Sequence, residues 1–288
     1  MNNSKVYDIV TERILNLIES SDKLVWQRGW NGGSKPMNYV SKKPYRGFNA
    51  MLTSFLYESP YYLTYKQVRD LGGKVKQGAK GVPIIYWNWL YFDENGKKVK
   101  TREEATKVVP LLRYFNVFNE EFIEGIDFKH EAVTPLSEAQ RKANCEDLIA
   151  KLVADKGLQI DNNGNGKAYY VPSKDSVHMP TFKSFKSAES YYSVAFHEIV
   201  HWTGHSSRMK RGLDTSLAPF GKTDYSKEEL VAEMGATFLC EEMQISNEQL
   251  NVNSAAYLKS WLKALKNDTS LLVSASGKAQ KAVDFILD

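Results

Sequence analysis

The chain has 288 residues, a formal net charge of +4, 42% hydrophobic residues, 25% charged residues and two cysteines. These values fit a globular protein with one large domain or two smaller ones, and they argue against wholesale disorder. No apolar run reaches the roughly 18–20 residues of a membrane helix, and the N-terminal segment lacks the basic head and apolar core of a signal peptide. Two cysteines cannot build a disulfide framework, so the sequence predicts a protein of the reducing cytoplasm with no membrane partner.

The first half of the chain is predicted to combine helices and strands. Apolar residues recur at three- and four-residue steps near the N-terminus, and Thr64 is expected to cap a short helix that ends at Gly72 and Gly73. The apolar run before the Asn95-Gly96 pair predicts a β-hairpin. The expected elements are helices over Lys5–Glu19, Asn49–Tyr57 and the segment after Thr64, the hairpin, and a strand over Val108–Phe118.

The second half is predicted to be mainly helical with a small sheet. The expected elements are helices over 137–156, 187–203, 226–243, 254–266 and 276–287, and strands around Ala168–Val171 and Ser176–Met179. Polar residues and Pro135 precede the first of these helices, so we place a domain boundary there. The sequence thus predicts an α+β protein with an α+β domain over 1–128 and a mainly helical domain over 136–288.

The small net charge conceals a strongly basic segment. Between Lys23 and Lys80 the chain has eleven Lys and Arg against two acids, a net charge of +9, with ten aromatic residues interleaved. Basic side chains follow a phosphate backbone and aromatic rings stack on unpaired bases, so single-stranded DNA is favoured over duplex. The alternative is that the aromatics form the domain core and the lysines only solvate its surface. The candidate DNA-binding residues are Trp26, Arg28, Trp30, Lys42, Lys43, Tyr45, Arg46, Lys74, Lys76 and Lys80.

The most specific motif is His197-Glu198-Ile199-Val200-His201, in a segment that predicts a helix. Residues four apart lie on one helix face, so His197 and His201 can bind one metal ion. Neutral imidazoles let Zn²⁺ lower the pKa of its water from about 15.7 toward about 7. Glu198 can take that water's proton and deliver it to the leaving amine. The alternative, a solvated face with incidental histidines, is weakened because three of the five histidines fall within nine residues.

A catalytic zinc site needs a third protein ligand, and the segment from Ser226 to Ala236 supplies acids at helical spacing. Glu229 and Glu233 share one face, while Glu228 is expected to point elsewhere. Ser226 and Glu229 also match a capping box, unless Thr223 or Asp224 caps the helix instead. The small residues Ala232, Gly235 and Ala236 suit close packing against the histidine helix.

The E-x-x-A-E-x-G arrangement of this segment resembles the E-x-x-[SA]-D element of gluzincin metallopeptidases. The resemblance implies that Glu229 is the third ligand and that Glu233 accepts a hydrogen bond from a ligand histidine, with Glu233 as the substitute ligand. Zn²⁺ is the expected metal, and Mn²⁺ is the other candidate.

Other residues near the motif are expected to have lesser roles. His205 is expected to be a surface histidine because Thr203-Gly204 ends the helix before it. Ser176–Met179 is the candidate edge strand for an extended peptide substrate, with His178 an ordinary strand residue. Tyr191 and Tyr192 are expected to be packing residues.

Taken together, the motifs resemble one known family. The segments W-Q-R-G-W, K-K-P-Y-R-G-F-N-A and L-T-Y-K-Q-V-R-D-L-G-G-K-V-K-Q-G-A-K-G are similar to the N-terminal domain of ArdC-type antirestriction proteins. The segments A-F-H-E-I-V-H-W-T-G-H and E-E-L-V-A-E-M-G-A resemble the zincin-like domain of that family. The resemblance implies a single-stranded-DNA-binding domain joined to a metallopeptidase domain related to Spartan-type proteases, carried on bacterial conjugative elements.

Two functions of different classes follow from these observations. The first is a zinc endopeptidase recruited to single-stranded DNA, with a protein or peptide substrate that includes DNA-bound proteins. The second is a protein that coats single-stranded DNA and whose metal site is structural or vestigial. The oligomeric state stays open.

Overall fold

The computed structural model describes residues 3–21, 34–130, 134–163, 165–213, 223–246 and 255–288. These residues form two compact units, and each contains both helices and strands. The first unit comprises the described residues of Met1–Leu17, Lys35–His130 and Leu265–Ser270. The second comprises those of Ile18–Ser34, Glu131–Ala264 and Leu271–Asp288. The α+β class and the two-domain organisation are therefore as predicted.

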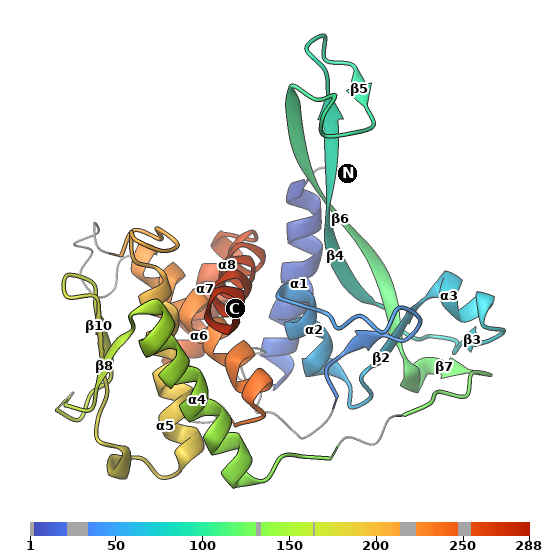
Figure 1. The fold of residues 1–288 in the computed structure, drawn as a ribbon. Helices are drawn as coiled ribbons and strands as arrows, with labels where there is room; N and C mark the ends of the chain where they lie inside the picture. Colours follow the sequence, from blue (N-terminus) through green and yellow to red (C-terminus); the bar gives the residue numbers. More distant parts are fainter. Residues whose placement is uncertain (1–2, 22–33, 131–133, 164, 214–222, 247–254) are drawn as a thin grey trace. The chain divides into compact units, whose positions relative to one another are not determined.

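The first unit is a five-stranded sheet with helices and a small two-stranded sheet (Figure 1). Its helices are most of α1 (Asn3–Ser21), α2 (Phe48–Leu56) and α3 (Tyr65–Asp70), and a 3₁₀ turn covers Glu120–Phe122. The larger sheet has the order β1-β2-β6-β4-β5, formed by β1 (Met37–Asn38), β2 (Tyr61–Thr64), β6 (Lys107–Asn119), β4 (Val82–Phe92) and β5 (Lys98–Val99). The smaller sheet pairs β3 (Lys74–Val75) with β7 (Ile123–Glu124).

Local sequence signals explain several of these elements. Val6, Val10 and Ile14 on the apolar stripe of α1 are all fully buried, as the periodicity predicts. Thr64 and Gln67 form a reciprocal capping box at the start of α3. Gly96 adopts a positive φ of 74° in the turn after β4, as the Asn-Gly pair predicts.

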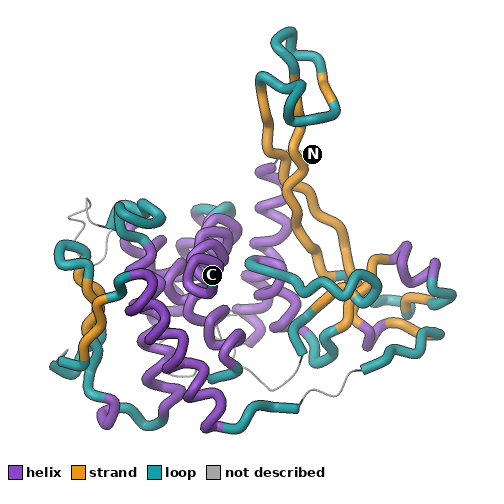
Figure 2. Tube along the Cα trace, viewed as in Figure 1, coloured by secondary structure: helices purple, strands orange, loops and turns teal. Residues whose placement is uncertain are grey.

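The hairpin prediction needs one correction. The turn at Gly96 leads into β5, which pairs with only the last two residues of β4. The long partner of β4 is β6, and the two strands pair antiparallel from Val82↔Val117 to Phe92↔Lys107. Figure 2 shows β4 and β6 running side by side as a two-stranded ribbon. We call residues 82–92 and 107–119 the β4–β6 ribbon.

The second unit is mainly helical and has one three-stranded sheet. Its helices are α4 (Glu138–Lys156), α5 (Ala188–Thr203), α6 (Thr223–Met243), most of α7 (Ala255–Asn267) and α8 (Leu271–Leu287), with a 3₁₀ turn over Phe182–Ser184. The strands β8 (Gln159–Asp161), β10 (Ser176–His178) and β9 (Tyr169–Val171) are adjacent in that order. The predicted helices are all present, although α6 and α8 begin earlier than expected.

The helix α5 lies at the centre of the second unit, against α6 and α8. Ser187 caps its N-terminus by accepting a hydrogen bond from the Ser190 amide, and Gly204 follows its last turn. A Cβ atom on Gly235 of α6 would lie 2.7 Å from Cγ2 of Val200 on α5, so the two helices meet there in close contact. Ala232 and Ala236 are fully buried beside this contact, as the small-residue pattern predicts.

No helix among the described residues combines the length and apolar character that crossing a bilayer requires.

Candidate metal centre

The second unit brings three candidate ligands together at one point. His197 and His201 lie one turn apart on α5, and their Nε2 atoms are 3.2 Å apart. Glu229 of α6 completes the group, because its Oε2 is 3.5 Å from Nε2 of His197 and its Oε1 is 3.2 Å from Nε2 of His201. Among the described residues, this is the one group of three or more potential His, Cys, Asp or Glu ligands with such mutual proximity.

The spacing of these atoms fits a divalent cation. Zinc bonds to imidazole nitrogen and carboxylate oxygen are about 2.0–2.2 Å long and tetrahedral, which places neighbouring ligand atoms roughly 3.3–3.6 Å apart. The three separations, 3.2, 3.2 and 3.5 Å, are close to that range. Two neutral imidazoles and one carboxylate are also a donor set that leaves a fourth position open in catalytic zinc sites. The residues present therefore fit a metal ion of this class.

The start of α6 decides between the two predicted roles of Glu229. The helix begins at Thr223, so Ser226 lies inside its first turns and is not the capping residue. The capping-box interpretation of Ser226 and Glu229 is therefore wrong, and the Glu229 carboxylate instead faces the two histidines.

The expectation that Glu228 points away from the site is also wrong. Its Oε1 lies 3.4 Å from Nδ1 of His201, whereas Glu229 lies beside the other ring nitrogen, Nε2, at the candidate metal position. Glu233 is buried on the same helix. The carboxylate beside His201 Nδ1 is thus that of Glu228, and Nδ1 of His197 has no hydrogen-bond partner among the described residues, so the expectation that Glu233 accepts a hydrogen bond from a ligand histidine is wrong. Glu228 and Glu229 reach the same histidine from different sides because His201 lies between them.

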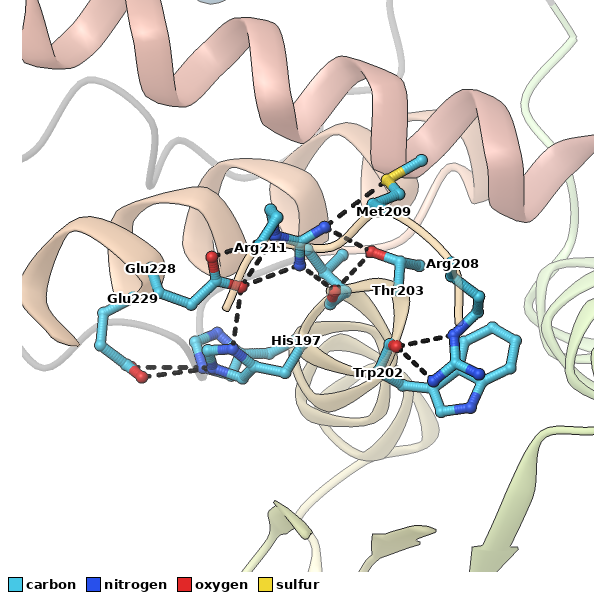
Figure 3. Close-up of polar contacts among 10 residues, drawn as sticks. His197, Trp202, Thr203, Arg208, Met209, Arg211, Glu228 and Glu229 are labelled. Carbon is cyan, nitrogen blue, oxygen red and sulfur yellow. Dashed lines mark hydrogen bonds and ion pairs between the residues drawn. The ribbon is translucent and has the colours of Figure 1, made fainter. Parts of the chain in front are cut away.

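An arginine that the sequence did not single out holds Glu228 in place. Arg211 donates from Nε to both carboxylate oxygens of Glu228 at 3.1 and 3.0 Å, and from Nη2 to Oε1 at 2.8 Å. It also donates to the Val200 carbonyl at 2.6 Å and to Oγ1 of Thr203 at 2.8 Å, near the end of α5 (Figure 3). Its side chain is only 6% exposed, so this is a buried ion pair with its hydrogen bonds made.

The electrostatics of the site favour a cation between the histidines and the acids. Burial works to lower the pKa of His201, but hydrogen bonds to Glu228 and Glu229 outweigh it and raise the pKa to about 10. Burial works to raise the pKa of Glu229, but its hydrogen bonds with His197 and His201 bring the pKa well below the usual value.

The candidate general base lies next to these ligands. Glu198 follows His197 on α5 and is 8% exposed, and its charge helps to raise the pKa of His201. Nδ1 of His197 is buried without a hydrogen-bond partner among the described residues.

The candidate substrate strand is not where the sequence placed it. Ser176–His178 forms β10, which is the central strand of its sheet and pairs with β8 on one side and β9 on the other. An extended peptide cannot add to a strand whose two edges are already hydrogen-bonded. The prediction that this segment is an edge strand is therefore wrong, and the edges of the sheet are β8 and β9.

The neighbouring residues have structural contacts. His178 lies 2.9 Å from Asp161 through Nδ1, and its ring stacks on Tyr169. Tyr191 and Tyr192 are buried and pack edge-on against each other, as expected of packing residues. His205 follows the end of α5, with its Nδ1 2.8 Å from Oγ of Ser207.

The predicted DNA-binding residues fall into three groups. Trp26, Arg28 and Trp30 lie outside the described residues. Tyr45 is half-buried, with its ring 5.9 Å from that of Tyr62, and burial raises its pKa to about 12, so it belongs to the packed interior. Exposed side chains are found at Lys42, Lys43, Arg46, Lys74, Lys76 and Lys80.

Two of these exposed lysines have partners in the first unit. Nζ of Lys42 lies 3.8 Å from the ring centre of Tyr39, and Nζ of Lys76 donates to the Glu121 carbonyl at 2.9 Å. Among the described residues of the first unit, the exposed large aromatic side chains are Tyr65, Tyr86, Trp87, Trp89 and Phe115, and none of these is among the candidate DNA-binding residues named from the sequence.

A helix with two histidines four residues apart, completed by a glutamate from a following helix, is the arrangement of zincin-like metallopeptidase domains. A family model described as zincin-like metallopeptidase matches residues 147–278, and one described as the N-terminal domain of anti-restriction factor ArdC matches residues 4–118. The crystal structure of the antirestriction protein ArdC from plasmid R388 is 31% identical, with a TM-score of 0.74 over 98% of this chain and 96% of that one. The chain belongs to the ArdC-type antirestriction family.

Two curated proteins are also similar to this chain. The chain is 33% identical to the DNA primase TraC of Escherichia coli in an alignment of 299 positions that covers 98% of this chain and 27% of TraC. It thus spans about a quarter of that curated relative. It is 31% identical to the uncharacterized protein y4eC of Sinorhizobium fredii, over 91% of that protein. The R388 protein has been solved both metal-free and with Mn(II) bound.

Proposed function

We propose that this chain is an antirestriction protein of a conjugative or other mobile element, in which a metal-dependent endopeptidase domain is brought to single-stranded DNA by the N-terminal domain. The observation that carries the enzymatic part is the convergence of His197, His201 and Glu229 at separations of 3.2–3.5 Å. Glu198 beside them supplies the group that a purely structural metal site does not need.

In this proposal His197, His201 and Glu229 would hold a divalent cation, which would supply Lewis-acid polarisation of the peptide carbonyl and of the attacking water. The Glu198 carboxylate accepts a proton from the attacking water as the new carbon–oxygen bond forms. It then donates that proton to the amine nitrogen as the peptide carbon–nitrogen bond breaks, so the base is regenerated. Glu228 keeps the His201 ring oriented by accepting a hydrogen bond at Nδ1.

The replacement of Glu198 by Gln tests the role of the base. The amide has nearly the same shape but cannot take a proton, so we expect the variant to bind metal and to lose hydrolysis of a peptide or of a DNA-bound protein. Metal content by mass spectrometry and product formation are measured on the same sample. Full activity in the variant would rule out Glu198 as the base.

The metal and its third ligand are tested together. We propose Zn²⁺, with Mn²⁺ as the other candidate, and the Mn(II)-bound relative makes both worth titrating. Glu229→Gln should abolish tight binding of either ion, whereas Glu233→Gln should leave binding intact. If Glu233→Gln lost metal binding and Glu229→Gln kept it, the third metal ligand would be Glu233.

An extended peptide substrate would add to an edge of the small sheet. We place it at β9 because this strand is a sheet edge and contacts α5. The substrate protein and the peptide bond that is cleaved can be identified by screening DNA-bound proteins for cleavage.

The second candidate function is a protein that only coats single-stranded DNA. The exposed basic side chains of the first unit, from Lys42 to Lys80, favour DNA binding whether or not the metal domain is active. Protection of transferred DNA by the Glu198→Gln variant separates the two functions. Full protection would favour coating, and lost protection would favour proteolysis.

DNA binding itself is tested by its salt dependence. Affinity for a single-stranded oligonucleotide should fall steeply as salt rises, and should exceed affinity for the duplex. Charge reversal at Lys42, Lys43 and Arg46 should weaken binding to all sequences about equally. A salt-insensitive affinity would contradict this part of the proposal.

A further inference from the structure

The β4–β6 ribbon exposes an unusual number of aromatic rings. Four of the ten exposed large hydrophobic side chains among the described residues lie on it: Tyr86, Trp87, Trp89 and Phe115. Trp89 is 52% exposed and Trp87 is 43% exposed, in a segment of regular antiparallel pairing. When exposed aromatic rings are concentrated on one surface and do not belong to a hydrophobic core, they mark a binding surface.

The pairing register places these rings on both faces of the ribbon. Tyr86 lies directly opposite Arg113, and Phe115 is its diagonal neighbour, with ring centres 5.6 Å apart. Trp87 and Trp89 point to the other face, because side chains alternate along a strand. Both faces therefore carry flat aromatic surface along the same stretch of β4.

The charge of the ribbon selects a polyanion as the partner. β4 has no charged residue, and the two in β6 are the exposed Lys107 and Arg113. Arg113 and Lys107 lie on the Tyr86 face, because they pair with Tyr86 and Phe92, and the exposed Asn88 lies on that face too, opposite to the two tryptophans. The Tyr86 face thus combines stacked rings with cationic and amide groups and has no acidic residue of β4 or β6, which suits the bases and phosphates of a single strand.

We propose that the Tyr86 face of the β4–β6 ribbon is the surface on which single-stranded DNA lies. Unpaired bases stack on the Tyr86–Phe115 pair, and the phosphates contact Arg113 and Lys107 on the same face. A duplex would not bind in this way, because its bases are already stacked on one another. The inference rests on the proposed DNA-binding function and names the surface responsible, which differs from the lysines and arginines predicted from the sequence.

The test separates stacking from simple apolar contact by the choice of side chain. Binding of a fluorescent oligothymidine is measured by anisotropy with the full chain and with a Tyr86→Leu/Phe115→Leu variant. Leucine keeps an apolar side chain but removes the ring, so affinity should fall by roughly 5- to 150-fold for each stacked base lost. Tyr86→Phe keeps the ring and should retain most of the affinity.

Two further variants complete the test. Tyr65→Leu removes an even more exposed ring of the same unit that lies outside the ribbon, and its affinity should be unchanged. Arg113→Gln should reduce the slope of log affinity against log salt by about 0.7, the value for one phosphate contact on a single strand. Circular dichroism and thermal melts of all variants check that the substitutions at these exposed positions leave the fold intact.

The outcomes distinguish this inference from the broader proposal. If the wild-type chain binds oligothymidine and the double leucine variant binds it equally well, the ribbon is not the surface while DNA binding stands. If the wild-type chain does not bind at all, both proposals are overturned. If the leucine variant changes the sedimentation of the protein but not its DNA affinity, the ribbon is a protein-docking surface and the inference is wrong.

Discussion

Arg211 holds the carboxylate of Glu228 through three hydrogen bonds, two from Nε and one from Nη2. The same guanidinium also bonds to the last turn of α5, so Glu228 is fixed relative to the helix that carries both histidines. Oε1 of Glu228 lies 3.4 Å from Nδ1 of His201 in consequence. A hydrogen bond at the far nitrogen of a ligand imidazole sets its tautomer and its orientation, which strengthens metal binding.

Replacing Glu228 by Gln should therefore weaken metal binding without removing a ligand. Losses of about 10- to 100-fold in metal affinity are typical when such a carboxylate is changed. Competition titration of Zn²⁺ and Mn²⁺ against a chelating dye measures the effect. Glu242→Gln, at an exposed position on the same helix, is the matched control. Unchanged affinity in the Glu228 variant would mean that the contact with His201 does not act on the metal.

A methyl group at Gly235 should disturb the contact between α5 and α6. The added Cβ would lie 2.7 and 2.9 Å from the two Cγ atoms of Val200, far inside van der Waals contact. Overpacking of this kind costs about 1–3 kcal/mol of the free energy of unfolding. Because α6 carries Glu229, Gly235→Ala should also weaken metal binding. Chemical denaturation and metal titration measure the two effects.

The matched control removes the opposing side chain. Val200→Ala makes room for the new methyl group, so the Gly235→Ala/Val200→Ala double variant should lose less stability than the two single changes predict together. If the stability losses of the two single variants simply add in the double variant, the contact between positions 235 and 200 is not the cause of the destabilisation.

The Asp175–Arg208 pair should make stability depend on pH in the acid range. Burial works to raise the pKa of Asp175, but hydrogen bonds from Arg208 and Tyr170 outweigh it and lower the pKa below its usual value. A carboxyl group with a lowered folded-state pKa contributes stability above about pH 4, and this contribution is lost as pH falls through the lowered pKa. Asp175→Asn lacks that contribution at every pH.

Denaturant titrations at neutral pH and at acid pH therefore test the pair. The stability difference between the wild-type chain and Asp175→Asn should be largest at neutral pH and shrink as the pH falls. Asp147→Asn, at an exposed position of α4, should show little difference at either pH. A stability difference between the wild-type chain and Asp175→Asn that grows as the pH falls would contradict the stabilising role of the Asp175–Arg208 pair.

The two cysteines should be unreactive in the folded protein. Cys145 and Cys240 are free and buried. Burial, with the charges of Glu189 and Glu146, raises the pKa of Cys145 to about 12, and burial raises the pKa of Cys240 well above its usual value. Because the thiolate is the reactive form, a thiol reagent at pH 8 should modify neither residue until denaturant is added, and then both. Rapid modification of the native chain would show that this part of the second unit opens readily.

The sequence could predict those parts of the site that depend on local spacing. His197 and His201 come together because they are four residues apart on one helix, and Glu229 could be named because its segment has helical periodicity and matches a known motif. Arg211 could not be found in this way. It lies in the connection after α5. Its contact with Glu228 of α6 depends on how that connection folds against the two helices, which no local sequence pattern specifies.

The errors in the small sheet and in the ribbon have a similar cause. Gln159–Asp161 is three residues long and has no recognisable strand pattern, so the sequence does not predict its parallel pairing with β10 and instead predicts that β10 is an edge strand. The apolar run of β4 was recognised as a strand, but its length and its pairing with β6 determine which rings remain exposed. Burial of an aromatic residue in a strand follows from its partners, which a local pattern does not specify.

The way the two units share the chain bears on any attempt to study them separately. The described part of α1 belongs to the first unit as far as Leu17, while Leu265–Ser270, from the far end of the sequence, completes the same unit. Thr11 donates to the Thr269 carbonyl at 2.7 Å, and Thr269 donates to Asp8 at 2.9 Å. A fragment that stops at the predicted boundary near residue 128 would lack Thr269 and leave the Thr11 hydroxyl without this acceptor. Expression of the N-terminal half alone should therefore yield a less stable protein than the same half with residues 265–270 restored by a short engineered linker.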